Sequence, residues 1–177
     1  KDGEVANILS DVHRQLKFAK SILEELGKVQ DREEFNNKFN SFISESKRVI
    51  GFLVDKNNLQ YFIKIGVHAK NMLDAWENSK NASDQEIIKY MEGNRHIVQH
   101  QKIIKPGNTV HLELNETVSF NDGNIKRNLN VPEDPKIIYQ SFTVDISGNK
   151  VEVLKLGEKY LDLLDEFVNL VKSRISS

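Results

Sequence analysis

The sequence predicts a mainly α protein, an up-and-down bundle of about five helices with a small antiparallel β insertion before the last helix. Apolar residues recur at three- and four-residue spacing through most of the chain, which is the pattern of amphipathic helices. Between residues 109 and 147 apolar and polar residues alternate instead, as they do in half-buried strands. The polar breaks between the helical segments are short, so consecutive helices are expected to pack antiparallel.

The first two helices each carry an apolar stripe, and capping residues stand between them. Residues 5–26 hold a stripe over about six turns, and Gly27 stands where a C-terminal cap would be. Asp31 offers an N-cap to the next helix, and Glu34 completes a capping-box pattern. Residues 35–53 place their phenylalanines on one helix face, which favours a role in the core.

The third and fourth helices are separated by polar segments. The break "DKNN" at 55–58 ends the second helix, and residues 59–76 carry a third apolar stripe. Ser83 can cap a fourth helix over about 84–104, with Glu86 as the reciprocal partner in a capping box. This fourth helix is apolar on two opposite sides. We therefore expect it to pack both on its own bundle and on a partner subunit or the following segment.

The alternating segment predicts strands joined by tight turns. Residues 109–120 alternate, and "NDGN" at 121–124 is a turn signal that predicts a hairpin with residues 125–131. Residues 137–146 form a second β-rich run, which "SGNK" then turns. A segment of this length is too short to bury a core alone, so it is an insertion and not a domain.

The last predicted helix spans residues 151–175 and closes a single domain over 1–177. Gly157 lowers the local helix propensity but lies near the packed stripe. A glycine at such a place indicates close contact with another helix.

The composition excludes several classes of function. A net charge of −1 gives the whole molecule little attraction for nucleic acid or anionic membranes, and leaves room for a local basic patch. The absence of cysteine excludes disulfides and thiolate chemistry, and fits a reducing cytoplasm. No apolar run could span a bilayer and the first residues lack a signal-peptide stretch, so we expect a cytoplasmic protein with no membrane partner. No phosphate-binding glycine loop, GxSxG or HExxH occurs, and no cofactor is expected.

The stretch "GNRHIVQH" at 93–100 is the densest group of reactive side chains, with Asn94, Arg95, His96 and His100. An arginine that is followed directly by Asn, Asp or His, and that four to six residues separate from a histidine, is expected about 0.1 times by chance in such a chain. It occurs here once.

Arg95 lies close to an apolar helix face, which is costly unless the guanidinium is paired or faces a cleft. One interpretation is therefore structural, with Arg95 bonded to a buried acid such as Asp74 or Glu92 or to helix-end carbonyls. The other is that the arginine belongs to a functional site.

A helical bundle with Arg-[Asn/Asp/His]-x3-His late in the chain resembles the HEPN superfamily, and the matching residues are Arg95, His96 and His100, with Asn94 just before them. The last helix, "VEVLKLGEKYLDLLDEFV", also resembles the final helix of HEPN-like bacterial and phage proteins. The β insertion departs from the minimal HEPN bundle and leaves the subfamily open. The resemblance implies a metal-independent endoribonuclease, often a toxin or defence component with an antitoxin-type partner, whose site lies in a two-fold homodimer cleft.

The chemistry of RNA cleavage by its own 2′-hydroxyl suits these side chains. It needs a proton acceptor, a proton donor and a cation for the charge on phosphorus. Histidine titrates near neutrality, so His100 could act as acid or base. The Arg95 guanidinium binds two phosphate oxygens and keeps its proton, which suits transition-state stabilisation. His96 or Asn94 could orient the phosphate or His100. A basic rim for RNA phosphates could be formed by Lys102, Lys105, Lys126 and Arg127, but acids are equally abundant in the chain, which favours a scattered surface instead.

Two features limit this hypothesis. Arg95 and His100 are five residues apart, about 140° around an ideal helix. They can serve one phosphate only if the helix ends near residue 99 or if the site straddles two subunits. His96 and His100 could instead clasp a metal, with Glu92 as the best third ligand, but a solvated pair and no metal are expected.

The competing hypothesis is a non-catalytic binding or interaction module. In that case Arg95 and His100 would serve packing or ligand recognition, because a fold alone does not fix a function.

Overall fold

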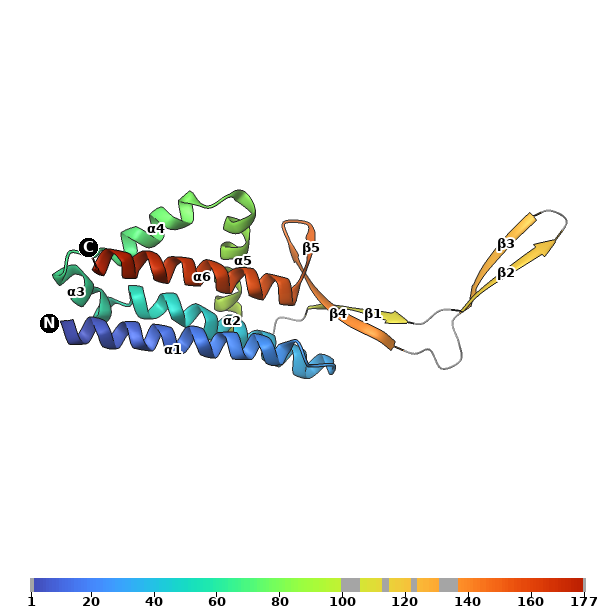
Figure 1. Ribbon diagram of the computed structural model, residues 1–177, viewed down its shortest axis with the longest axis horizontal. Helices are drawn as coiled ribbons and strands as arrows, with labels where there is room; N and C mark the ends of the chain where they lie inside the picture. Colours follow the sequence, from blue (N-terminus) through green and yellow to red (C-terminus); the bar gives the residue numbers. More distant parts are fainter. Residues whose placement is uncertain (1, 100–105, 113–114, 122–123, 131–136, 177) are drawn as a thin grey trace.

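The computed structural model describes residues 2–99, 106–112, 115–121, 124–130 and 137–176. Within this part the protein is mainly α, with an antiparallel β insertion before the last helix, as predicted (Figure 1). Its helices are α1 (Asp2–Leu26), α2 (Arg32–Val54), α3 (Lys56–Lys64), α4 (Ala69–Ser79), α5 (Ala82–Gln99) and α6 (Val153–Ile175). Its strands are β1 (Gly107–Leu112), β2 (Asn115–Asn121), β3 (Asn124–Asn130), β4 (Ile137–Ile146) and β5 (Asn149–Glu152).

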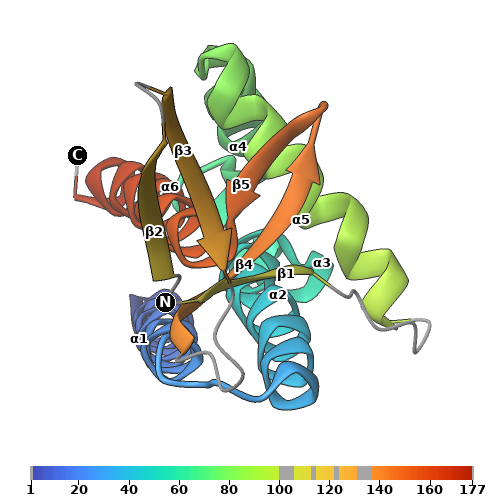
Figure 2. The same ribbon diagram turned by 90° about the vertical axis from the view of Figure 1, so that its right-hand side faces the viewer.

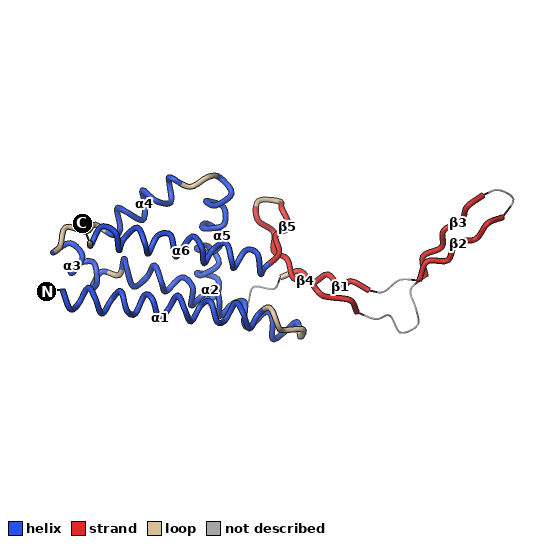
Figure 3. Tube along the Cα trace, in the orientation of Figure 1, coloured by secondary structure: helices blue, strands red, loops and turns tan. Residues whose placement is uncertain are grey.

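The long helices α1, α2 and α6 lie lengthwise and side by side, and all the strands lie toward one end of the bundle (Figure 3). The core forms where the apolar stripes of these helices meet. Its largest fully buried side chains are Tyr160, Phe39, Phe42, Phe62 and Phe167. The phenylalanine face of the second predicted helix is confirmed as core, because Phe35, Phe39 and Phe42 are all buried. Burial of such rings contributes strongly to the stability of a bundle of this size.

The third predicted helix is two helices, which brings the helices of the described residues to six. The chain breaks between α3 and α4 at Gly66, whose φ of +79° is incompatible with a continuing α-helix. The backbone N–H of Val67 turns back to the carbonyl of Phe62, 2.9 Å away. The apolar spacing continues across this turn, so the periodicity alone predicted one helix.

The predicted break at 55–58 is also shorter than expected. Only Asp55 separates α2 from α3, and its side chain accepts a hydrogen bond from the backbone N–H of Asn57 at 2.8 Å. The aspartate therefore serves as N-cap of α3 directly after α2 ends.

The two predicted N-caps have different outcomes. Asp31 accepts from the backbone N–H of Glu34 at 2.8 Å and caps α2, as predicted. The prediction of Ser83 as the cap of the fourth helix is wrong, because α5 begins at Ala82. There the Asn81 side chain accepts from the backbone N–H of Asp84 at 2.8 Å, so Asn81 takes the capping role.

The β insertion forms two antiparallel sheets. One is three-stranded in the order β1–β4–β5, and the other is the hairpin β2–β3. The hairpin predicted at 121–124 is confirmed, since Phe120 pairs with Ile125 and Asn121 with Asn124. The three-stranded sheet is tied to the helices by Phe142 of β4, whose ring stacks on that of Phe35 of α2 with centroids 3.7 Å apart. Figures 1 and 2 show β2 and β3 lying beyond this sheet, away from the helices.

The close contact predicted at Gly157 is confirmed. A Cβ atom there would overlap Cδ1 of Leu23 on α1 and would lie 3.3 Å from Cε1 of Phe42 on α2. The absence of a side chain at this position therefore lets α6 pack closely on both helices. The helix itself starts at Val153, because Val151 and Glu152 still pair with β4.

Candidate functional site

The predicted site begins on α5, a helix that is anchored at its start and along one face. Asn81 caps it, and the buried side chains of Ile88 and Met91 hold it in the core. The helix packs mainly on α2. It is described as far as Gln99, so its final turns carry the first part of the "GNRHIVQH" stretch.

The structure places the predicted site residues to different extents. Asn94 is half-buried on α5, and its side-chain amide donates to the carbonyl of Tyr90 at 2.9 Å. Arg95 and His96 follow it on the helix backbone, and their side chains lie outside the described part. His100 lies outside the described residues.

Lys102 and Lys105 also lie outside the described residues. The structure thus brings Asn94, Arg95 and His96 onto one helical turn, and leaves their relation to His100 and the two lysines as a prediction.

Acidic side chains stand one turn before the motif. Glu92, considered above as a partner for Arg95, lies with a carboxylate oxygen 3.5 Å from Nζ of Lys47 on α2. The pKa of the neighbouring Glu77 carboxyl is raised, first by burial and then by the negative charges of Glu92 and Asp74. Glu92 therefore already has a cationic neighbour in Lys47.

The phenol of Tyr90 lies on the same helix, and burial raises its pKa to about 12. The hydroxyl therefore keeps its proton at neutral pH and can donate a hydrogen bond, but it cannot serve as a base there.

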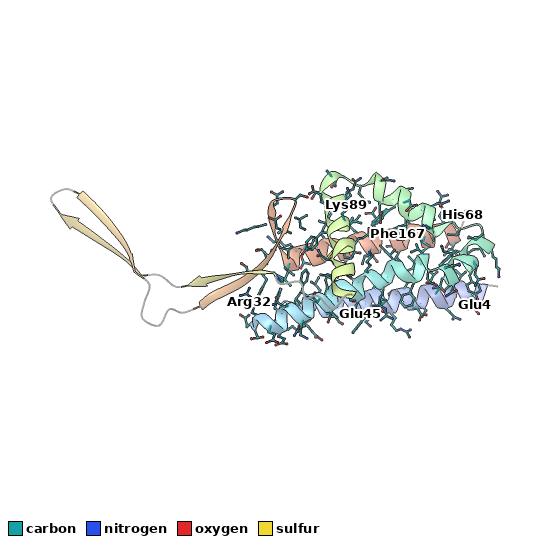
Figure 4. All side chains as sticks on the ribbon, turned by 180° about the vertical axis from the view of Figure 1, so that it is seen from behind. Glu4, Arg32, Glu45, His68, Lys89 and Phe167 are labelled. Atoms are coloured by element: carbon teal, nitrogen blue, oxygen red, sulfur yellow. The ribbon has the colours of Figure 1, made fainter. Side chains whose placement is uncertain are left out.

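The other described histidines lie elsewhere. His13 is exposed on α1, His68 is exposed just before α4, and His111 lies on β1. Figure 4 shows His68 at the end of the bundle away from the sheet. In the part of the chain that the structure describes, no group of three histidine or acidic side chains is arranged to hold a metal ion.

A second feature was not found from the sequence: a groove of about 680 Å³ between α1 and α6. Its floor is apolar, formed by leucines of both helices: Leu16, Leu23, Leu154 and Leu161. Glu24 and Gly27 line one end.

The two sides of this groove carry opposite charges. The side on α1, here called the basic bank, is formed by His13, Lys17 and Lys20. The side on α6, the acidic bank, is formed by Glu158, Asp162 and Asp165. All six of these residues are exposed. Helical spacing of three and four residues places each set on one face of its helix, which is a sequence signal that could have predicted both banks.

No protein-family model, no curated protein and no solved structure matches this chain. Among the helices of the described residues, none combines the length and the apolar character needed to cross a membrane.

Proposed function

We propose that this protein is a HEPN-like endoribonuclease that needs no metal, with Arg95 and His100 acting together at a homodimer cleft. The observation that carries the proposal is the single occurrence of Arg95-His96-x3-His100 in a mainly α bundle, with Arg95 and His96 on α5. Support also comes from α5 itself, because its cap and its buried face fix the helix that carries Arg95. Rigid placement of the reacting groups is what such catalysis requires.

The reaction proposed is transesterification. The 2′-oxygen attacks phosphorus and loses its proton to a base, the bond from phosphorus to the 5′-oxygen breaks, and that oxygen gains a proton. The products are a 2′,3′-cyclic phosphate and a 5′-hydroxyl end. His100 takes up or supplies a proton, and Arg95 binds the phosphate oxygens as negative charge builds on them.

The remaining side chains have supporting roles in this proposal. Asn94 and His96 orient the phosphate or His100, and Lys102 and Lys105 hold neighbouring phosphates. A toxin or defence component of this kind would act in the cytoplasm and would need an antitoxin-type protein partner to restrain it.

The proposal is tested by RNA cleavage in the presence of EDTA. The wild type is expected to cleave and to leave cyclic phosphate ends. His100→Ala is expected to lose roughly 10²–10⁴-fold in rate, the usual contribution of one acid or base. His68→Ala removes an exposed histidine far from α5 and is expected to keep the wild-type rate. Equal cleavage rates for wild type and His100→Ala, or no cleavage by either, would refute the proposed ribonuclease activity.

A second candidate is a non-catalytic interaction module, and the groove between α1 and α6 favours it. An apolar floor between charged sides is typical of surfaces that bind protein. A wild type that binds protein but never cleaves RNA would support this candidate.

A further inference from the structure

We propose that the groove between α1 and α6 is a contact surface for a second copy of this chain, related to the first by a two-fold axis parallel to these helices. The inference is independent of RNA cleavage. It rests on the charges of the basic and acidic banks, on the antiparallel course of the two helices and on the size of the surface they form.

The charges of the two banks are available for a partner. Among the described residues no ion pair joins one bank to the other. Neighbouring residues of these helices do form ion pairs, Arg14 with Asp11 within α1 and Lys159 of α6 with Asp84 of α5. The leucine floor separates the banks and is itself only partly covered, since Leu16, Leu154 and Leu161 are half-buried. A partner must therefore offer an apolar centre with acids on one side and bases on the other.

A second copy meets this requirement through symmetry. The helices α1 and α6 lie side by side and run in opposite directions (Figure 1). A two-fold axis parallel to them places α1 of each copy over α6 of the other, so that each basic bank faces an acidic bank. A two-fold axis across the helices would place α1 over α1 and bring like charges together. The charge pattern therefore selects the parallel axis.

The heights of the charges along the helices also agree with this axis. Leu23 of α1 lies against Gly157 of α6, which fixes how the two antiparallel helices are aligned. Counting back from Leu23, Lys20 lies at the height between Glu158 and Asp162, and Lys17 lies close to the height of Asp162. A two-fold axis parallel to the helices keeps these heights, so each lysine meets acids of the other copy.

The surface is large enough for a dimer. Over their full length the two adjacent helices present a face about 35 Å long and about 20 Å wide, or roughly 700 Å² from each subunit, and the groove with its banks takes up about half of that length. Specific stable interfaces take about 600–1,000 Å² from each partner, so the dimer contact would use the whole face of the two helices and not the groove alone. The groove face lies on the opposite side of the bundle from α5 (Figure 2), so a copy seated there leaves α5 uncovered.

The test is the mass of charge-reversal variants in solution, measured by light scattering after gel filtration. Lys17→Glu with Lys20→Glu makes both banks acidic, and Glu158→Lys with Asp162→Lys makes both banks basic. Each variant is expected to have half the wild-type mass. An equimolar mixture of the two is expected to recover the wild-type mass, because acidic banks of one chain then face basic banks of the other. The chain with all four changes is expected to recover it too.

The matched control, Lys64→Glu with Lys70→Glu, makes the same change of charge at exposed positions of α3 and α4 and is expected to keep the wild-type mass. If the proposed homodimer cleft at α5 forms as a second contact, the wild-type assembly contains four chains and the assembly of each bank variant contains two. A wild type with the mass of one chain would overturn the inference. So would bank variants that keep the wild-type mass, or a mixture that stays at half of it. None of these outcomes depends on RNA cleavage.

Discussion

At the scale of single residues, burial and nearby charge decide how the described carboxylates behave. Glu77 is half-buried near two other acids, whereas Glu166 accepts hydrogen bonds from Trp76 and Lys80. The pKa of Glu77 is therefore raised, and that of Glu166 is lowered, chiefly by the Lys80 hydrogen bond. Opposite shifts predict opposite dependence of stability on pH.

Glu77→Gln is expected to raise the free energy of unfolding at neutral pH. The folded protein binds a proton at Glu77 more tightly than the unfolded chain does, so stability falls as pH rises from the ordinary value of 4.5 through the raised pKa. The neutral amide of glutamine removes the cost of burying the charged carboxylate. The gain in stability over the wild type should therefore vanish below pH 4.5, where the carboxyl is protonated in both the folded and the unfolded chain. Urea unfolding at several pH values measures both effects.

Glu166→Gln is the control of opposite sign. The contacts that lower the pKa of Glu166 stabilise the fold at pH values above its ordinary pKa of 4.5, and this stabilisation is lost as the pH falls through the folded-state pKa. Because the side chain is half exposed, the loss at neutral pH is expected to be about 0.2–1 kcal/mol. A Glu77→Gln variant that is less stable than wild type at neutral pH would contradict the account of that site.

Gly157→Ala is expected to destabilise the protein by about 1–3 kcal/mol, although alanine is the better helix former. The new Cβ would overlap the buried side chain of Leu23 and would crowd the fully buried ring of Phe42, so the packing of α6 on α1 and α2 must shift. Gly51→Ala in α2 is the matched control, because a Cβ there meets nothing within 4 Å. It is expected to stabilise by about 0.5–1 kcal/mol. Thermal or urea unfolding measures the stability of both variants. A Gly157→Ala variant more stable than the wild type would refute the close contact at this position.

At the scale of helices and strands, the sequence predicted which elements exist better than it predicted where each one begins and ends. The helices at the two ends of the chain and the hairpin at 121–124 follow from periodicity and turn residues. The break at Gly66 was missed because the apolar spacing on either side of it happens to stay in phase. A glycine inside a helical pattern can pack closely, as Gly157 does, or end the helix, as Gly66 does, and local spacing does not distinguish the two.

Asn81→Ala is expected to destabilise the protein by about 0.5–2 kcal/mol, because the backbone N–H of Asp84 loses its acceptor. Ser83→Ala should have little effect, since Ser83 is exposed and lies inside the first turn of α5 and not at its cap. Chemical unfolding of the two variants compares the caps. A larger loss for Ser83→Ala would restore the capping box that the sequence suggested.

At the scale of the whole molecule, the sequence predicted the architecture but not the surface. Bundle topology follows from apolar stripes and short connections, which are local features. The groove between α1 and α6 joins residues from opposite ends of the chain, such as Lys17 and Asp162, and only the folded arrangement brings them together. The motif around Arg95 could be read from the sequence because its residues are adjacent, while the geometry that joins Arg95 to His100 remains a prediction.

Two subunits are central to the proposed site, because Arg95 and His100, five residues apart, would point about 140° apart on one ideal helix. Mixing two inactive variants tests this most directly. Arg95→Ala still supplies His100, and His100→Ala still supplies Arg95. In a random mixture half of the dimers are mixed, and each has one intact composite site, so about a quarter of the wild-type cleavage rate should return. A mixture no more active than either variant alone would contradict a site shared between subunits.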